Sequence, residues 1–433
     1  MRVALYFLLF VSQVVFSTEK VPQHPPVLNK LPDPISLELA LSLADANHPD
    51  ISSIEYAIEA AKSQTSLAMS KTNLQLRVKA RARLIDPPRS LNGFGRQDHA
   101  GKFFASQTLY DFGRTGNKVE AKKIREEIAK LRLRQVKQYR RIQIMQAYFD
   151  VLLGDLTFLR DNESMTMGFL RYDRAKDRQE LGQISEVEVL EKENIYFERR
   201  VEKNNSESMQ RLLRNQFSIV LNRPENIISH FEAPELKYHE FKLLDVALLH
   251  ESAEESNLEL RIIQLSLEAL RAELQSIRSN RYPTISAEAE AGMYKRDIGS
   301  NDRWRAGLVF DMPIYQGGKI SHQKNEIRMR IKQLENQYYQ KKLTIKQQVL
   351  NHYLNIEKLA SQKESSYKRF DYSELYLDRA RAIYEMEVKS DLGDAMVQLS
   401  QASLQMAETD FEIAMRWEKL RMLTQMKLEE MRQ

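Results

Sequence analysis

The sequence predicts a mixed α+β membrane protein, built mostly of long coiled-coil-like α-helices with four transmembrane β-strands in each protomer. Three observations lead to this prediction: two long stretches without proline, four short segments that alternate apolar and polar residues, and an internal repeat. The chain has 433 residues, of which 65 are basic and 60 acidic. These charges alternate along the expected helices, which is typical of solvated helix faces and not of a nucleic-acid-binding surface.

The first residues have the features of an export signal. Arg2 supplies a positive start, an apolar core runs from Val3 to Phe16, and small residues precede Thr18. We therefore expect a signal peptide at residues 1–17 and export from the cytoplasm. Since the sequence contains no cysteine, it offers no disulfide and no site for a lipid anchor at the mature end.

The two halves of the chain repeat one another. A shift of 207 residues places Leu37 on Leu244, and a shift of 205 places Gly113 on Gly318, with further matches across most of each half. A tandem duplication explains this register better than chance. The predicted organisation is a signal peptide at 1–17, a first repeat at 18–225, a linker or equatorial segment at 226–242, and a second repeat at 243–433.

Long helices are expected where proline is absent. No proline occurs between Arg89 and Arg223 or between Ile314 and Gln433, and a proline inside a helix costs about 3 kcal/mol. Apolar residues recur there at helical spacing and form a narrow stripe, while the other positions are largely charged. The helices should therefore pack as in a coiled coil and not around a thick globular core.

Four shorter segments show the period of two that marks a strand with one apolar and one polar face. They are residues 77–84, 102–110, 284–293 and 304–314. Transmembrane strands have about 9–11 residues, so two membrane hairpins are expected. Tyr282, Tyr294 and Trp304 stand at strand ends, where the aromatic girdles of a membrane sheet belong. A soluble hairpin packed on the helices is the alternative interpretation.

The polar faces of these strands carry charges that cannot face lipid. The candidate lumen-facing charges are Arg77, Lys79, Arg81 and Arg83 in the first half, and Glu288 and Glu290 in the second. Opposite charges at equivalent positions indicate pairing around a water-filled interior, although a solvent-exposed sheet would also carry them. In lipid every strand edge must be paired, and four strands cannot close a barrel. The chain must then share its barrel with copies of itself.

Several motifs follow one another along the chain in a fixed order. They are the doubled unit, the opening Asn47-His48-Pro49, the strand exits Leu109-Tyr110-Asp111-Phe112-Gly113-Arg114 and Pro313-Ile314-Tyr315-Gln316-Gly317-Gly318-Lys319, and the helix turn Glu180-Leu181-Gly182-Gln183-Ile184-Ser185. In this combination the chain resembles the TolC-type outer-membrane efflux and secretion channels over nearly the whole mature sequence. It departs from that family at Glu387, where the second helix turn usually has a glycine.

The resemblance implies a homotrimer with a 12-stranded β-barrel, continued by a 12-helix α-barrel. It places the protein in the outer membrane of a Gram-negative bacterium, in contact with membrane lipid and with a large periplasmic portion. The implied function is the exit duct of a tripartite efflux pump or a type I secretion system, which conducts substrates passively. The implied partners are a periplasmic adaptor (membrane fusion) protein and an inner-membrane transporter, and no nucleic acid.

The two turns between long helices should form the periplasmic tips of this duct. The candidate adaptor contacts are Gly182, Gln183, Ile184, Ser185, Lys389 and Ser390. Family members often carry a ring of carboxylates at this end, which selects cations by charge. The candidate gate residues are Asp391, Asp394, Glu186 and Glu188. The alternative is that these four acids stabilise helix N-termini.

The sequence contains no catalytic constellation, and we expect no enzymatic activity, cofactor or metal site. Its eight histidines are not spaced as paired metal ligands. His352 falls on an apolar stripe, which predicts a packed core residue. The alternative function is a periplasmic coiled-coil scaffold or adaptor protein without a membrane barrel, and a basic nucleic-acid-binding helical protein is a third class. The sequence does not identify the transported substrate.

Overall fold

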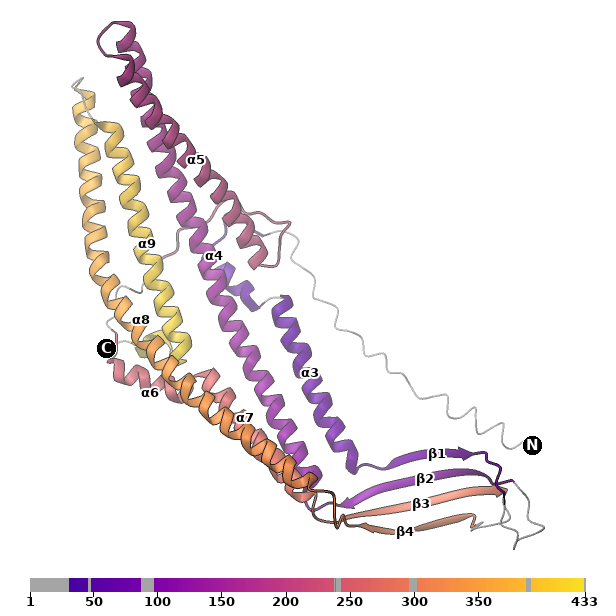
Figure 1. Ribbon diagram of the computed structural model, residues 1–433. Helices are drawn as coiled ribbons and strands as arrows, with labels where there is room; N and C mark the ends of the chain where they lie inside the picture. The colour runs from indigo at the N-terminus through magenta and orange to yellow at the C-terminus, as the bar shows by residue number, and fades with distance from the viewer. Residues whose placement is uncertain are drawn as a thin grey trace.

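A computed structural model describes residues 31–45, 48–86, 97–236, 238, 243–295, 302–386 and 391–431. Long helices and a small sheet form an elongated molecule, with the sheet at one end and the far ends of the long helices at the other (Figure 1). Within the described part of the chain, none of the helices combines the length and the hydropathy that a bilayer crossing requires. The expected signal peptide at 1–17 lies outside the described residues.

The same order of elements occurs in both halves of the chain. The first half holds α2 (Leu37–Ser42), α3 (Pro49–Met69), β1 (Gln75–Arg81), β2 (His99–Tyr110), α4 (Arg114–Glu180) and α5 (Glu186–Val220). The second half holds α6 (Val246–Ser256), α7 (Leu258–Ser279), β3 (Thr284–Lys295), β4 (Trp304–Asp311), α8 (Lys319–Glu385) and α9 (Leu392–Thr424). Short 3₁₀ segments at Leu43–Asp45, Ser70–Thr72 and Leu428–Met431 adjoin these elements.

The two longest helices occupy the two stretches without proline, as predicted. α4 and α8 each have 67 residues, which corresponds to about 100 Å at 1.5 Å per residue. Both begin after a glycine with φ of 79°, Gly113 before α4 and Gly318 before α8. Residues with a side chain rarely adopt this backbone conformation. The two glycines therefore turn the chain from strand to helix at matching points of the two halves.

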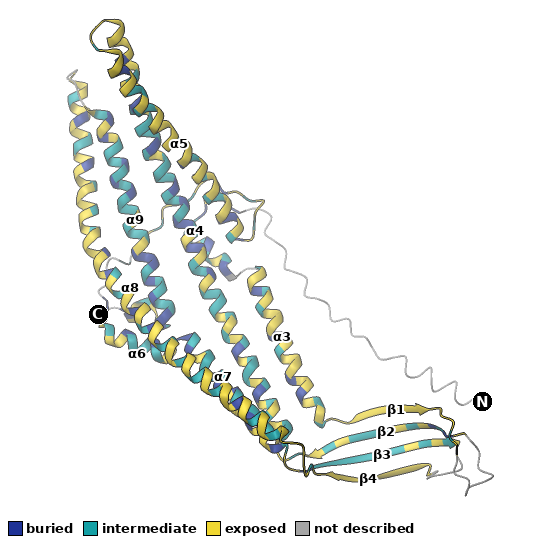
Figure 2. Ribbon diagram, viewed as in Figure 1, coloured by how far each residue is buried: buried dark blue, intermediate teal, exposed yellow. Residues whose placement is uncertain are grey.

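The four predicted strands form one antiparallel sheet with the order β1-β2-β3-β4. Its register places Arg77 opposite Phe104, Phe104 opposite Glu290, and Glu290 opposite Arg305. Side chains alternate between the two faces of a strand, so the charged residues of all four strands, except Lys295 at the end of β3, share one face, here called the polar face. The opposite, apolar face carries Val78, Phe103, Ala289 and Leu308. β1 and β4 form the edges and are exposed along their whole length (Figure 2).

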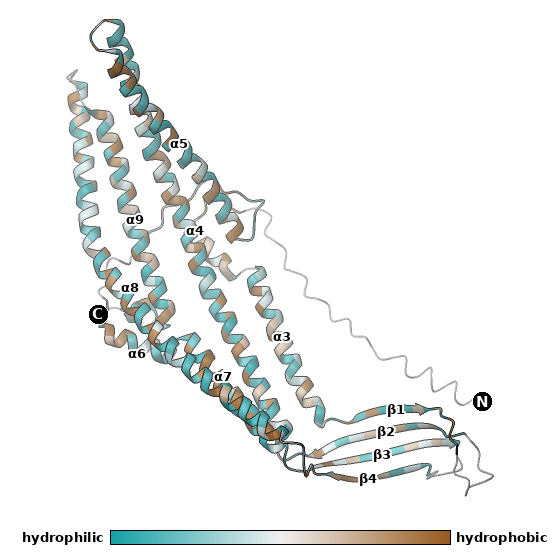
Figure 3. Ribbon diagram, in the orientation of Figure 1, coloured by the Kyte–Doolittle hydropathy of each residue, from teal (hydrophilic) through white to brown (hydrophobic). Residues whose placement is uncertain are grey.

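The core lies midway along the molecule, where the short elements pack on the long helices. One buried cluster centres on Ile144, Tyr148 and Phe217, and a second on Val349 and Trp417. Elsewhere the long helices show mixed hydropathy, with hydrophilic residues along much of their surface (Figure 3). The packing is therefore that of a coiled coil, as the narrow apolar stripe predicted.

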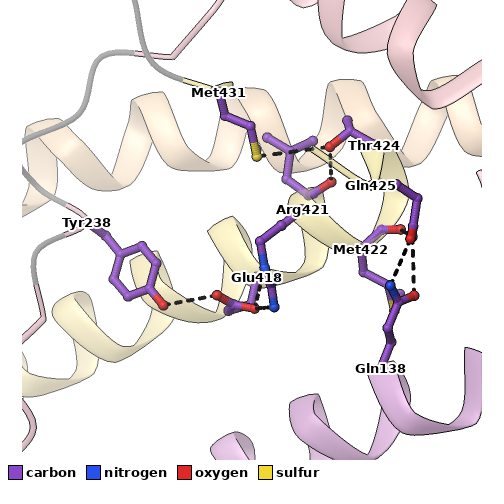
Figure 4. Close-up of polar contacts among 9 residues, drawn as sticks. Gln138, Tyr238, Glu418, Arg421, Met422, Thr424, Gln425 and Met431 are labelled. Carbon is purple, nitrogen blue, oxygen red and sulfur yellow. Dashed lines mark hydrogen bonds and ion pairs between the residues drawn. The ribbon is translucent and has the colours of Figure 1, made fainter. Parts of the chain in front are cut away.

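Polar contacts hold the end of α9 against the linker and against α4 (Figure 4). Tyr238 in the linker donates its hydroxyl proton to the Glu418 carboxylate at 3.2 Å, and Arg421 binds the same carboxylate at 2.6 Å. Burial raises the pKa of Tyr238, so its hydroxyl stays a donor. The side-chain amide of Gln138 on α4 donates to that of Gln425 at 2.8 Å. These contacts join the second half of the chain to the first.

Candidate functional site

The polar face of the sheet centres on Glu290 of β3. Lys102 of β2 lies 2.6 Å from its carboxylate, Arg305 of β4 lies 3.0 Å from it, and the Tyr294 hydroxyl donates to it at 2.7 Å. Glu288 lies on the same face two positions earlier along β3. Within the protomer Glu290 therefore pairs with β2 and β4 and not with the cations of the first strand, because β2 lies between β1 and β3. Pairing of opposite charges around a water-filled interior stays a prediction.

The predicted cations of the first strand have different positions. Arg77, Lys79 and Arg81 are exposed residues of β1, and their alternation puts them on the polar face. β1 ends at Arg81, two residues before Arg83, which forms an ion pair with Asp98. Arg83 therefore belongs to the connection between β1 and β2, and the prediction that it lies in the strand is wrong.

The aromatic residues expected in a girdle divide between the two faces. Trp304 lies opposite Ala291 on the apolar face, with 73% of its surface exposed. Tyr282 stacks on Phe112 with the ring centroids 5.3 Å apart, at the end of the sheet nearest the helices. Tyr294 instead shares the polar face with Glu290, so it does not face the same side as Trp304.

The first tip is a tight turn between α4 and α5. Gly182 has φ of 68°, and the backbone amide of Gln183 donates to the carbonyl of Arg178 at 2.8 Å. Ile184 is half-buried, whereas Leu181 has 71% of its surface exposed. The turn thus presents an apolar side chain to its surroundings at the far end of the molecule.

The acids of the first tip stand at the start of α5. Ser185 caps this helix by accepting from the Glu188 amide at 3.3 Å, and the Ser185 amide donates back to the Glu188 carboxylate at 3.3 Å. This reciprocal pair is a capping box. Glu186 lies in the same first turn. The geometry therefore gives Glu188 a structural role in the helix N-terminus, whatever else it does.

The acids of the second tip stand at the start of α9. Asp391 occupies the N-cap position, but its side chain makes no capping hydrogen bond. Asp394, in the first turn, forms an ion pair with Arg171 of α4. Lys389 and Ser390, the other candidates of this tip, lie outside the described residues, as does Glu387. The structure thus brings one candidate gate acid into contact with the first half of the chain.

No group of three or more histidine, cysteine or acidic side chains in the described ranges is arranged to hold a metal ion. His352 of α8 has a buried Nδ1, and burial, with smaller effects of Arg416 and Lys419, lowers its pKa to about 4. It is therefore neutral near pH 7.

A sheet with one charged face and one apolar face, continued by helices of about 100 Å, is the architecture of one protomer of a membrane-embedded duct. The chain belongs to the outer membrane efflux protein family, whose model matches residues 40–211 and 249–424. It is an outer-membrane exit duct for efflux. The predicted fold class and the predicted location, the outer membrane of a Gram-negative bacterium with a large periplasmic helical portion, are confirmed.

Solved structures of channels share this fold. The CmeC outer-membrane channel of Campylobacter jejuni has a TM-score of 0.74 at 13% identity, with 91% of this chain and 88% of CmeC covered. A membrane protein from Pseudomonas aeruginosa has a TM-score of 0.73 at 15% identity, covering 93% and 96%. CusC has a TM-score of 0.70 at 16% identity, covering 90% and 91%. No curated protein sequence matches the chain.

Proposed function

We propose that three copies of this chain close one barrel and so complete the duct. The observation that carries the proposal is the four-stranded sheet with two exposed edges, β1 and β4. An unpaired strand edge in lipid costs several kcal/mol for each backbone group. Pairing β1 of one copy with β4 of the next removes every edge, and cyclic symmetry repeats the same contact in each copy.

The polar face of the sheet lines the water-filled interior in this arrangement, and the apolar face contacts outer-membrane lipid. Arg77, Lys79, Arg81, Glu288 and Glu290 would then line the barrel lumen. The order of the described elements also supports the proposed division into two repeats, 18–225 and 243–433, joined by a linker at 226–242. A signal peptide at 1–17 would precede them.

The proposed partners are a periplasmic adaptor and an inner-membrane transporter, with which the chain forms a tripartite efflux pump or a type I secretion system. The exposed Leu181 and Val187 at the first tip support an adaptor contact there, since 71% and 74% of their surfaces are exposed. Gly182, Gln183, Ile184 and Ser185 would form this contact with Lys389 and Ser390 of the second tip. The duct would conduct passively and catalyse no reaction.

Light scattering of the detergent-purified protein, corrected for bound detergent, tests the assembly. We expect three chains in each particle. A monomer would contradict the proposed architecture, because four strands cannot close a barrel. A dimer would contradict it as well, because it would hold eight strands and not the proposed twelve.

Cysteine labelling tests the orientation. The chain has no native cysteine, so single cysteines at Ser90 and Ser300, in the two hairpin connections outside the described residues, can be labelled without background. An impermeant maleimide should reach both on intact cells. If it labels a control outer-membrane loop but neither of these sites, the hairpins do not face the cell exterior.

A further inference from the structure

A cavity of about 380 Å³ lies where the sheet meets the helices. The 3₁₀ segment Ser70–Thr72 that follows α3, the first turns of α4 and the last turns of α7 enclose it. Its charged lining residues are five cations and one acid: Lys71, Arg114, Lys118, Lys122, Arg125 and Glu273. Such a surplus of one sign of charge in a partly enclosed space needs a physical explanation, because like charges in a cavity repel one another.

The protein itself compensates only part of this charge. Glu273, the one acid among the described lining residues, lies 2.5 Å from Arg125. Lys122 donates to the neutral side chain of Gln64 at 2.8 Å, so its charge is not cancelled there. The Glu273 carboxylate can neutralise one of the five cations, so the described lining residues keep an excess of positive charge.

Two further observations indicate that a negatively charged group would fit this cavity. Repulsion from Lys71, followed by burial, lowers the pKa of Lys118, with only a smaller opposing effect of Glu273. The Nε of Arg114 is buried without a hydrogen-bond partner among the described residues, while its Nη2 donates to the Tyr282 carbonyl at 3.3 Å. An oxyanion between these side chains would relieve the repulsion and accept from the unused donor.

The cavity adjoins the polar face of the sheet. Arg114 and Asn280 line it, and they also line a second cavity together with Thr284 and Asp311. Thr284 and Asp311 are register partners, and Thr284 lies on the polar face with Glu288. An ion arriving from the water-filled side would therefore meet this cavity directly. α4 contacts both α3 and α7.

We propose that this cavity is a binding site for a phosphate group. Phosphate has several strongly accepting oxygens and suits a cluster that combines the planar fork of Arg114 with the point charges of Lys71 and Lys118. The group could belong to an anionic solute within the duct or to the headgroup of a lipid at the membrane surface. The continuity with the polar face favours the solute. The cavity itself lies within one protomer, whereas the preference for a solute rests on the proposed water-filled interior.

Calorimetric titration of the full-length protein in a neutral detergent, free of added phospholipid, tests the site. Sodium pyrophosphate serves as the probe, with sodium sulfate at equal ionic strength for comparison. We expect saturable binding by the native protein and a loss of affinity of at least about tenfold in the Lys71→Gln/Lys118→Gln variant, since two charge-assisted contacts are removed. The matched control is Lys123→Gln, which changes an exposed lysine of α4 outside the cavity and should bind as the native protein does.

A second titration distinguishes the source of the phosphate group. If lipid headgroups occupy the site, increasing phosphatidylglycerol in the micelles should raise the unfolding temperature of the native protein and of Lys123→Gln. The unfolding temperature of the double variant should rise less. If the native protein binds pyrophosphate and the double variant does not, the group belongs to a solute. If only the lipid effect is lost in the double variant, the group belongs to a lipid headgroup. The proposed site would be overturned if the native protein showed neither effect. It would also be overturned if both effects were the same in the native protein and in the double variant. Circular dichroism of the variants verifies that each is folded.

Discussion

Arg171 on α4 and Asp394 on α9 form an ion pair, although 223 positions separate them in the sequence. Their side chains are 52% and 48% exposed. The pair joins the long helix of the first half to the returning helix of the second half, close to the periplasmic tips. Gly393 of α9 lies directly against Met167 of α4, since a Cβ at position 393 would clash with the Met167 side chain. The two halves are thus in contact close to the proposed gate.

Replacing Arg171 with glutamine should loosen this junction. We expect a higher single-channel conductance in planar bilayers, because the released Asp394 no longer ties α9 to α4. The stability should change by no more than about 1 kcal/mol, as for other exposed ion pairs. Arg199→Gln is the matched control, since the ion pair of Arg199 with Glu202 lies within α5. Equal conductance of Arg171→Gln and Arg199→Gln would show that the pair does not restrain the gate.

The double change of Asp391 and Asp394 to alanine tests whether these acids form the gate itself. If their carboxylates surround the axis in a trimer, conductance should rise, while cation selectivity and block by multivalent cations should weaken. Planar bilayers with asymmetric salt measure both properties. A properly trimeric double variant with native conductance and selectivity would leave the acids only with their structural roles at the start of α9.

Glu188 should behave differently from the acids of the second tip. Its carboxylate belongs to the capping box of α5, so Glu188→Ala removes a hydrogen bond from the helix end at a cost of about 1 kcal/mol. We expect faster amide exchange in the first turn of α5 and unchanged ion selectivity. Glu186→Ala is the control, because Glu186 lies in the same turn outside the capping pair. A loss of selectivity in Glu188→Ala alone would assign Glu188 to the gate.

The regular features of the fold followed from the sequence because each depends on neighbouring residues. Proline exclusion located α4 and α8, and alternation located the four strands. The sequence could also have predicted that Tyr294 lies on the polar face, since Tyr294 is an even number of residues from Glu288 and Glu290 along the same strand. Its position at a strand end suggested a girdle instead.

Other features depend on contacts that no local pattern contains. The partners of Glu290 come from β2 and β4, and they depend on the strand order and the register. The contact of Arg171 with Asp394 depends on how two long helices pack far from either turn. The cavity where the sheet meets the helices is likewise lined by Lys71, Lys118 and Glu273 from three separate helical segments. The charges along each of these segments alone resemble an ordinary solvated face.

The lowered pKa of His352 predicts how the stability of the folded protein depends on pH. Burial first, then the positive charges of Arg416 and Lys419, lower its pKa from 6.5 to about 4 in the folded protein. The unfolded chain therefore binds a proton more readily than the folded chain. The stabilising effect of the neutral ring is complete above about pH 6.5 and is lost as the pH falls towards 4. With a discount for partial solvent access, the loss by pH 5 is about 1 to 2 kcal/mol.

The variant His352→Gln isolates this contribution, because glutamine does not titrate and all other groups are shared with the native protein. Unfolding temperatures should be measured for both proteins from pH 8 to pH 5 in the same detergent. We expect the native protein to lose more stability than the variant between pH 6.5 and pH 5, while the difference between the two stays constant above pH 7. Parallel curves over the whole range would mean that His352 is hydrated enough to titrate normally in the folded duct, so that its burial between α8 and α9 does not couple protonation to unfolding.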